Sequence, residues 1–332
     1  MLLLAPFKYL SFLPLGNIHY NLNKPNEKKI DYPILFKKLN SYFKNKIKKM
    51  FEDKTEDFML AMILGERTKI EKKVLRDFIR TGTLHFLAIS GLHMVIITSI
   101  FIFLFLFFRI NFKKAILFSI FAITFYVTIV PLRPSVLRSF IMIIFYLSSL
   151  LQSKRVHPLS IIGNAGLLSL FLFPESAFDP GFHLSYLATI GISVLFPLFE
   201  KPKIKNSFIR NFLYLPFCVS LSAQVFVYPY IYFFFKNISI VAPLSNIILS
   251  PLTFLSLLGG ILTIISADIC PFISLKFANF SEFITHITFI TLDYLSRISP
   301  FFYTEKVNYA VLSVLIFLPI LLYSLKILYL RK

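Results

Sequence analysis

Long apolar stretches recur along most of this chain and are separated by short polar or charged connections. Most of them contain about 17 to 25 residues, which is the length that an α-helix needs to cross the hydrocarbon core of a bilayer. The pattern predicts an all-α, polytopic membrane protein with about nine transmembrane helices, within a range of about seven to eleven. The expected spans are residues 84–108, 114–132, 134–152, 157–173, 182–199, 212–235, 239–266, 270–297 and 308–330.

The stretch at 270–297 is the weakest of these, because Lys276, Glu282, His286 and Asp293 interrupt it. It fits either an interfacial helix or a helix whose polar side faces the bundle interior. The pattern also divides the chain into three parts. These are an apolar, membrane-associated stub at 1–23, a basic amphipathic helical region at 24–80 and the polytopic core at 81–332.

Composition excludes an ordinary soluble domain. The 332 residues are 57% hydrophobic, include 41 Phe and no Trp, and have a mean hydropathy of +0.75. The formal net charge is +19, and the segment from Lys37 to Lys49 holds lysines and no acidic residue. Two interpretations of the 24–80 region stay open: a basic surface lying on anionic lipid, or a collar that contacts nucleic-acid phosphates at a channel mouth.

Basic residues between the spans indicate an orientation. They follow the first, third and fifth spans, which places those connections in the cytoplasm and the 24–80 region outside. The basic character of 24–80 argues against this placement, so either that region lies along the outer leaflet or the first span is misplaced. The residues concerned are Arg109, Lys113, Lys114, Lys154, Arg155, Lys201, Lys203, Lys205 and Arg210.

The segment Gly82–His93 opens the first expected span with polar and small residues. Lipid cannot hydrate a hydroxyl or an imidazole, so His85, Ser90 and His93 must face a protein interior or a water-filled path. We therefore expect this segment to line a protein interior or a water-filled path.

Two arginines flank the broken start of the third span. An Arg near the middle of a membrane costs about 2.5 to 3.5 kcal/mol on insertion scales, so Arg138 requires an anionic partner or an aqueous path. Arg133 lies closer to the end of the span, and snorkelling to the interface explains it as well as function does.

A second polar cluster opens the fifth span with Asp179, His183 and Ser185. Asp179 stands ahead of a proline, which is a strong helix-capping arrangement. For His183, a hydrogen bond to a buried carbonyl is a sufficient structural explanation. Both residues therefore keep a structural alternative beside a functional one.

The sixth and seventh spans carry the amides of Gln224 and Asn246. Polar side chains that join helices explain many such residues without transport. Pro229 and Pro251 stand inside the same spans and predict discontinuous helices, which line cavities in channels and transporters.

No cofactor or metal is expected. Cys218 and Cys270 support neither a disulfide framework nor a zinc site, and the six histidines form no His-Glu-x-x-His pair. The chain has no Gly-x-x-x-x-Gly-Lys-Ser/Thr loop for a nucleotide and no His-x-His-x-Asp-His zinc signature. We therefore expect no ATPase or nuclease activity from this chain.

The segment Phe78–His93 (FIRTGTLHFLAISGLH) closely resembles the signature of the ComEC-type competence proteins of bacteria. Five further segments are similar to elements of that family and stand in its order: LAMILGER (60–67), PSVLRSFIM (134–142), PGFHLSYLATIG (180–191), SAQVFVYP (222–229) and LSNIILSP (244–251). The small or rigid positions of these motifs are Gly82, Gly91, Pro134, Gly181, Pro229 and Pro251.

The resemblance implies a multi-pass channel of the bacterial inner membrane that passes one strand of DNA into the cytoplasm during natural transformation. On this hypothesis Arg138 and Arg133 contact phosphates. The polar lining comprises His85, Ser90, His93, Asp179, His183, Ser185, Gln224 and Asn246. The expected partners are single-stranded DNA, anionic lipid, a helicase-like ATPase, a DNA receptor and a separate nuclease. The sequence predicts no oligomeric state.

The resemblance implies that complete members of that family have up to three parts: an outer oligonucleotide-binding-like domain, a membrane core and often a metallo-β-lactamase-like nuclease domain. This chain is similar to the core alone. A small-molecule or anion transporter is the alternative, since broken helices and an intramembrane Arg suit it too. An intramembrane serine protease is a remote alternative, in which Ser90 would act with His183, but the leading Gly of such a site is absent.

Overall fold

The computed structural model describes residues 34–131, 134–153, 156–199, 204–299, 301–303, 308, 311–317 and 324. The apolar stub at 1–23, the start of the basic region at 24–33 and Arg133 lie outside these described residues. The predicted roles of those parts stay predictions.

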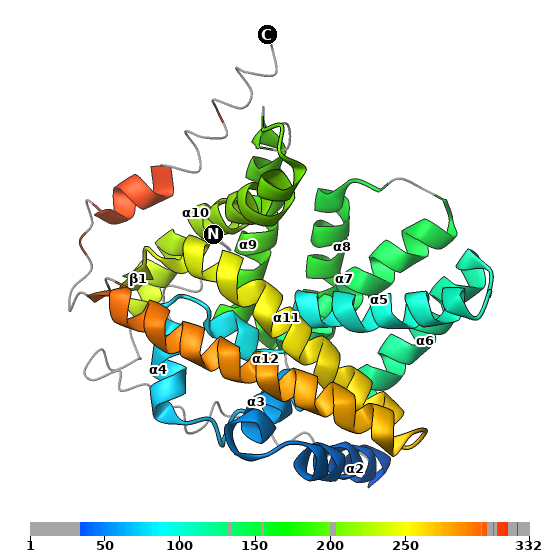
Figure 1. Ribbon diagram of the computed structural model, residues 1–332. Coiled ribbons are helices and arrows are strands. Elements are labelled where there is room, and N and C mark those ends of the chain that lie inside the picture. The colour runs from blue at the N-terminus through cyan, green and yellow to red at the C-terminus, as the bar shows by residue number, and fades with distance from the viewer. Residues whose placement is uncertain are drawn as a thin grey trace.

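Helices dominate the described residues, so the all-α class is confirmed (Figure 1). Those of the first half are α2 (Ile34–Met50), α3 (Asp53–Leu64), α4 (Lys72–Arg80), the 3₁₀ turn η2 (Leu84–Leu87), α5 (Gly91–Phe107), α6 (Phe112–Ile129), α7 (Pro134–Leu151) and α8 (Pro158–Leu172). Those of the second half are η3 (Pro174–Phe178), α9 (Pro180–Leu195), η4 (Phe196–Leu198), the π-helical turn η5 (Ile209–Tyr214), α10 (Leu215–Phe235), α11 (Ala242–Ser266) and α12 (Pro271–Ile298).

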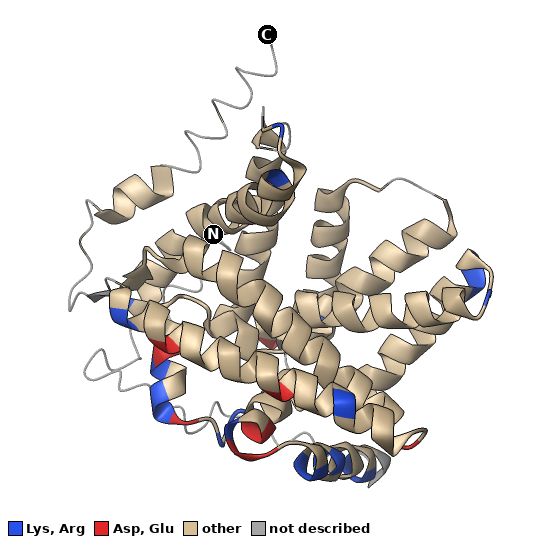
Figure 2. Ribbon diagram, viewed as in Figure 1, with Lys and Arg blue, Asp and Glu red and all other residues tan. Residues whose placement is uncertain are grey.

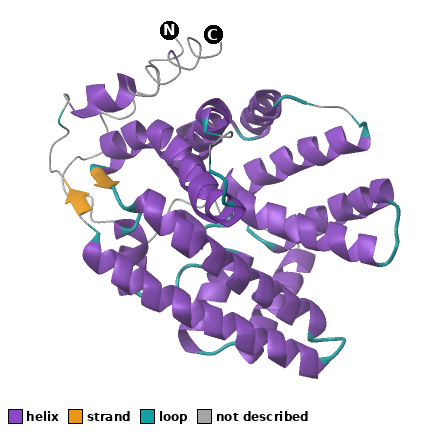
Figure 3. Ribbon diagram, turned by 45° about the horizontal axis from the view of Figure 1, so that its top comes forward, coloured by secondary structure: helices purple, strands orange, loops and turns teal. Residues whose placement is uncertain are grey.

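A short antiparallel ribbon joins β1 (Asn237–Ser239) to β2 (Phe301–Tyr303), with Asn237 opposite Tyr303 and Ser239 opposite Phe301 (Figure 3). The ribbon brings the end of α10 next to the end of α12. It therefore joins two segments that are far apart in the sequence.

The count of nine spans is not confirmed. The described residues contain four helices long and apolar enough to cross a membrane: Phe112–Ile129, Pro180–Leu198, Ile209–Phe235 and Ala242–Ser266. The apolar helices Gly91–Phe107, Ser135–Leu151 and Pro158–Leu172 are shorter. Of the last expected span, 308–330, only a few residues are described.

The first expected span, 84–108, is not one helix. The chain makes the turn η2, passes through extended backbone at Ala88, and begins α5 only at Gly91. Ser90 is the N-cap of α5, with φ −122° and ψ 178°, and it forms a capping box with His93. The polar residues that marked this segment therefore end one element and start the next.

The prediction that helices break at Pro229 and Pro251 is wrong. The helix α10 continues through Pro229, and α11 continues through Pro251. Neighbouring helices accommodate prolines in membrane proteins without ending the helix. The irregular backbone lies instead before α5, before α9 and in η5.

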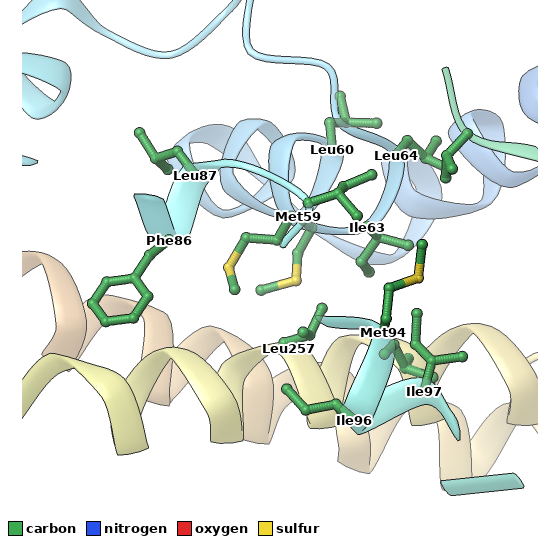
Figure 4. Close-up of a cluster of buried hydrophobic side chains, with 14 of the residues drawn as sticks. Met59, Leu60, Ile63, Leu64, Phe86, Leu87, Met94, Ile96, Ile97 and Leu257 are labelled. Carbon is green, nitrogen blue, oxygen red and sulfur yellow. The ribbon is translucent and has the colours of Figure 1, made fainter. Parts of the chain in front are cut away.

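The main hydrophobic core lies between α3, η2, α5 and α11 (Figure 4). Every residue of α3 from Phe58 to Leu64 is buried, so this half of the helix is surrounded on all sides. Gly65 ends α3 with φ +74°, its N–H bonded to the carbonyl of Ala61 and the next N–H to that of Leu60, a Schellman arrangement. The core thus joins the region before residue 80 to the signature segment.

The helices α11 and α12 pack through small and hydroxyl-bearing residues. The Ser281 hydroxyl donates to the carbonyl of Ser256 at 2.8 Å. A Cβ atom added at Gly259 would lie 3.0 Å from that of Ser281. Close approach of this kind is typical of helix pairs in membranes.

Charged residues gather along α2, α3, α4 and one side of α12, whereas the basic turn between α5 and α6 lies at the far end of the molecule (Figure 2). Asp293 of α12 pairs with Lys73 of α4 at 2.8 Å, and Lys46 of α2 pairs with Asp268 at 2.5 Å. Glu282 accepts a hydrogen bond from the backbone N–H of Glu52. The acids that interrupt the 270–297 stretch therefore bind the helices before residue 80.

Candidate functional site

The signature segment is fixed at its first end by residues from the distant ribbon. The carbonyl of Arg80, at the end of α4, accepts hydrogen bonds from the hydroxyls of Ser239 at 2.6 Å and Ser299 at 3.0 Å. Gly82 has φ +70°, and a Cβ atom there would lie 2.5 Å from the Cβ of Ala242. The turn therefore requires glycine both for its backbone conformation and for the close approach of α11.

His85 is the residue of η2 that turns away from the core. Phe86 and Leu87 beside it are buried, whereas the His85 side chain is exposed. Its ring bonds to the backbone of Gly82 and lies beside that of Phe86, with 4.3 Å between the ring centres, so the segment itself sets the orientation of this exposed imidazole.

Ser90 and His93 bond to each other at the start of α5. The Ser90 Oγ lies 3.0 Å from the Nδ1 of His93, which also accepts the backbone N–H of Ser90 at 3.3 Å. His93 is 1% exposed, and its Nε2 has no hydrogen-bond partner among the described residues. The two side chains act locally as a helix cap.

Arg138 joins α7 to the start of α9. It is 4% exposed, its Nη1 donates to the carbonyl of Gly181 at 3.2 Å, and its guanidinium lies 5.5 Å from the centre of the Tyr186 ring. Its Nε has no hydrogen-bond partner in the described part of the chain. Asp179 caps α9 by accepting the N–H of Gly181 at 2.8 Å. The groups that hold Arg138 are therefore the carbonyl of Gly181 and the ring of Tyr186. They take the place of the anionic partner that the sequence suggested.

His183 and Ser185 follow on α9. The Nε2 of His183 lies 2.8 Å from the carbonyl oxygen of Ala177, and its ring stacks on Tyr230 with 5.3 Å between centres. The carbonyl of half-buried Ser185 accepts the hydroxyl of Thr189. The structure thus gives His183 the carbonyl partner expected on structural grounds. It does not bring His183 to Ser90, whose hydroxyl lies against His93.

A polar network joins α10 to α11 and β1. The Ser220 hydroxyl accepts from Asn246 at 2.7 Å and from Gln224 at 3.2 Å. The Tyr228 hydroxyl lies 2.5 Å from the Oε1 of Gln224 and 2.8 Å from the carbonyl of Ser239. The network thus ends at the residue that also holds the carbonyl of Arg80.

Sequence reasoning missed three members of this arrangement: Ser220, Tyr228 and Tyr186. Ser220, Gln224 and Tyr228 are four residues apart and therefore share one side of α10. That spacing is a signal that the sequence already contains. Tyr186 has no such signal, because its contact with Arg138 joins different helices.

The signature segment lies between the two other polar groups. At Gly82 it meets Ala242 and Ser239 beside the α10–α11 network. At Gly91 an added Cβ atom would lie 3.9 Å from the hydroxyl of Ser139, the neighbour of Arg138 on α7. The two glycines therefore mark the contacts through which one segment reaches both groups.

Comparison with known proteins decides the family. The model of the competence protein family matches residues 62–329, which include the signature segment and both polar groups. The chain belongs to the competence protein family. It is 26% identical over 258 residues to the ComE operon protein 3 of Bacillus subtilis (strain 168), a match that covers 76% of this chain and 32% of that protein.

The chain is also similar to an uncharacterized protein of Aquifex aeolicus (strain VF5), to which it is 28% identical over 286 residues, or 85% of this chain and 62% of that protein. The chain thus spans less than two thirds of either relative. No solved structure matches it. The apolar helices and the family together support a membrane protein with a competence-related role.

Proposed function

We propose that this chain forms a channel that passes one strand of DNA across the bacterial inner membrane during natural transformation. The observation that supports it most is the position of the signature segment. It leaves the helical pattern between η2 and α5 and exposes His85. It also lies against Ser139, the neighbour of Arg138, and against Ser239, where the network of Gln224 ends. A path of hydroxyls, imidazoles and amides with isolated arginines can contact a strand without holding it too tightly to move.

The charge distribution supports an orientation for this channel. The α5–α6 turn carries Arg109, Lys113 and Lys114 and lies away from α2, α3 and α4 (Figure 2). By the tendency of basic loops to stay in the cytoplasm, this turn faces inward. The helices α2 to α4 then face outward, although they too are basic and the same tendency opposes that placement. Incoming DNA would then meet the charged helices first.

Passage itself requires partners. The chain has no nucleotide-binding loop, so a helicase-like ATPase would supply the pulling force. A DNA receptor would deliver the strand, and a separate nuclease would remove its complement. The local geometry described above does not depend on any of these partners.

Deletion of the gene tests the proposal. Labelled DNA should still bind the cell surface but should no longer enter the cytoplasm, because the path across the membrane is lost. Unchanged entry of DNA would refute the channel function.

Arg138→Met tests the site within the channel. Met removes the charge and the donor to the Gly181 carbonyl, and its flexible, unbranched apolar side chain fills the inner part of the space that the Arg138 stem occupies. We expect normal amounts of folded protein and reduced DNA uptake. The matched control is Lys114→Ala, which removes one exposed charge from α6. Normal uptake by a well-expressed Arg138→Met variant would remove Arg138 from the path.

A further inference from the structure

We propose that α4 is a guide for phosphates, in which Lys72, Arg76 and Arg80 contact successive phosphates of a single strand and lead it to the signature segment. The inference rests on the proposed channel function and deepens it, because it names where the strand is first held. We call these three residues the α4 stripe.

The α4 stripe follows from helix geometry. Its members are four residues apart, so they lie on one side of the helix, with a rise of about 6 Å from each to the next. All three are exposed. The step is of the same order as the distance between neighbouring phosphates of an extended strand, which a basic groove follows along its backbone.

The opposite side of α4 keeps the stripe in place. Phe78 is fully buried, and Val74 and Leu75 pack against the main core. The helix therefore cannot turn its charged side toward the protein without exposing this apolar side.

The stripe is free of partners, unlike the other lysines around it. Lys54 pairs with Glu71, Lys69 with Glu56 and Lys73 with Asp293. In the part of the chain that the structure describes, no side chain pairs with or bonds to the side chains of the α4 stripe. Glu71, Glu56 and Asp293 are thus paired with other lysines, and the three stripe cations stay available to an anion.

The stripe ends at the signature. The carbonyl of Arg80 is held by the hydroxyls of Ser239 and Ser299, and Gly82 and His85 follow within a few residues. A strand that follows the stripe from Lys72 to Arg80 therefore arrives at the exposed imidazole of His85.

The surface of α4 favours a nucleic acid over a lipid surface. A helix that lies on a bilayer inserts a free apolar side between the headgroups. In α4 the large apolar residues face the protein core, and none of them is strongly exposed. In contrast, α2 exposes the ring of Tyr42 together with Lys38, Lys48 and Lys49, so among these helices it is better suited than α4 to a lipid surface.

Binding of a single-stranded oligonucleotide tests the proposal. The full-length protein is placed in nanodiscs of zwitterionic lipid, and its affinity for a fluorescent oligonucleotide is measured over a range of salt concentrations. Each phosphate contact on a single strand contributes about 0.7 to the slope of log affinity against log salt. The variant Lys72→Gln/Arg76→Gln/Arg80→Gln should therefore lower the magnitude of this slope by about 2.

Two controls separate position from charge. Lys38→Gln/Lys48→Gln/Lys49→Gln removes the same number of charges from α2 and should leave the slope unchanged. Lys72→Arg/Arg76→Lys/Arg80→Lys keeps the charge of the stripe and should keep most of the slope. Thermal unfolding of each variant is compared with that of the parent, because all the substituted residues are exposed and the fold should be unchanged.

Several results would overturn the proposal. These are an unchanged slope in the stripe variant, an equal loss in the α2 variant, or no salt-dependent binding by the parent protein. Loss of binding to anionic vesicles, with oligonucleotide binding kept, would assign the stripe to lipid instead. DNA uptake in cells tells the two proposals apart: if deletion of the gene abolishes uptake but the stripe variant restores it fully, the channel function stands and the phosphate guide fails.

Discussion

Replacing Gly82 with alanine should disrupt the signature segment without removing any polar side chain. Gly82 has φ +70°, a left-handed conformation that costs an L-residue about 1 to 2 kcal/mol. The added Cβ would also lie 2.5 Å from the Cβ of Ala242 and 3.1 Å from that of Ser239. A β-carbon cannot rotate away, so the backbone of α11 or of the turn must move, at about 1 to 3 kcal/mol. Together the two effects destabilise the folded protein by about 2 to 5 kcal/mol.

Gly163→Ala is the matched control for this substitution. Gly163 lies within α8, and a Cβ atom added there meets nothing within 4 Å. Alanine is favoured over glycine inside a helix by up to about 1 kcal/mol, so this variant should be as stable as the parent or slightly more stable. The comparison holds the chemical change constant and varies only its surroundings.

The assay is thermal or denaturant unfolding of both purified variants in the same detergent, with DNA uptake measured in parallel. We expect Gly82→Ala to unfold earlier and to take up little DNA, and Gly163→Ala to match the parent in both. If Gly82→Ala is as stable as Gly163→Ala, then α11 does not hold the turn as described. The close approach of Ala242 to Gly82 would then not explain the conformation of the turn.

Three further tests concern packing and charge elsewhere. Gly191→Ala should destabilise the protein more than Gly260→Ala in unfolding assays. The new Cβ meets a backbone carbonyl of α10 at 2.5 Å in the first variant, but the flexible end of a Met side chain in the second. Equal losses of stability would contradict this explanation. Tyr228→Phe should cost about 1 to 3 kcal/mol of unfolding free energy, since it removes a part-buried hydroxyl that joins α10 to β1; a variant as stable as the parent would contradict this. Hydrogen bonding to Lys73 holds the pKa of Asp293 below its usual 3.8, so this contact stabilises the α4–α12 pair at neutral pH and is lost as the pH falls below that value. The protection factors of the α4 amides, which correct for the intrinsic pH dependence of exchange, should therefore fall in acid and, at neutral pH, in Asp293→Asn. Equal protection in that variant and the parent would refute the role of the pair.

The apolar pattern predicts the middle of the fold well. The helices α6, α7 and α8 begin and end within three residues of the spans expected at 114–132, 134–152 and 157–173. Their boundaries are local: Pro134 and Pro158 each stand at the first position of a helix, where proline is favoured. Local signals of this kind can be found in a sequence without knowledge of the neighbours.

Hydropathy fails where distant residues decide the structure. It merges η2 with α5, because it cannot detect that Ser90 and His93 cap a helix. It also treats the acids at 270–297 as interruptions, although Asp293 meets Lys73 from a helix far earlier in the chain. The partner of Arg138 is a backbone carbonyl, which no sequence pattern can assign.

The end of α4 connects the stripe, the signature segment and the last helix. The final carbonyls of a helix have no partner inside it, and a buried one must find another. The carbonyl of Arg80 finds two, from Ser239 and Ser299, which are 159 and 219 residues further along the chain. Ser239 belongs to β1 and Ser299 stands just before β2, so residues of the ribbon region hold this end of α4. The direction in which α4 points its free cations, and the turn that presents His85, therefore depend on the assembly of α10, α11 and α12 rather than on the signature residues alone.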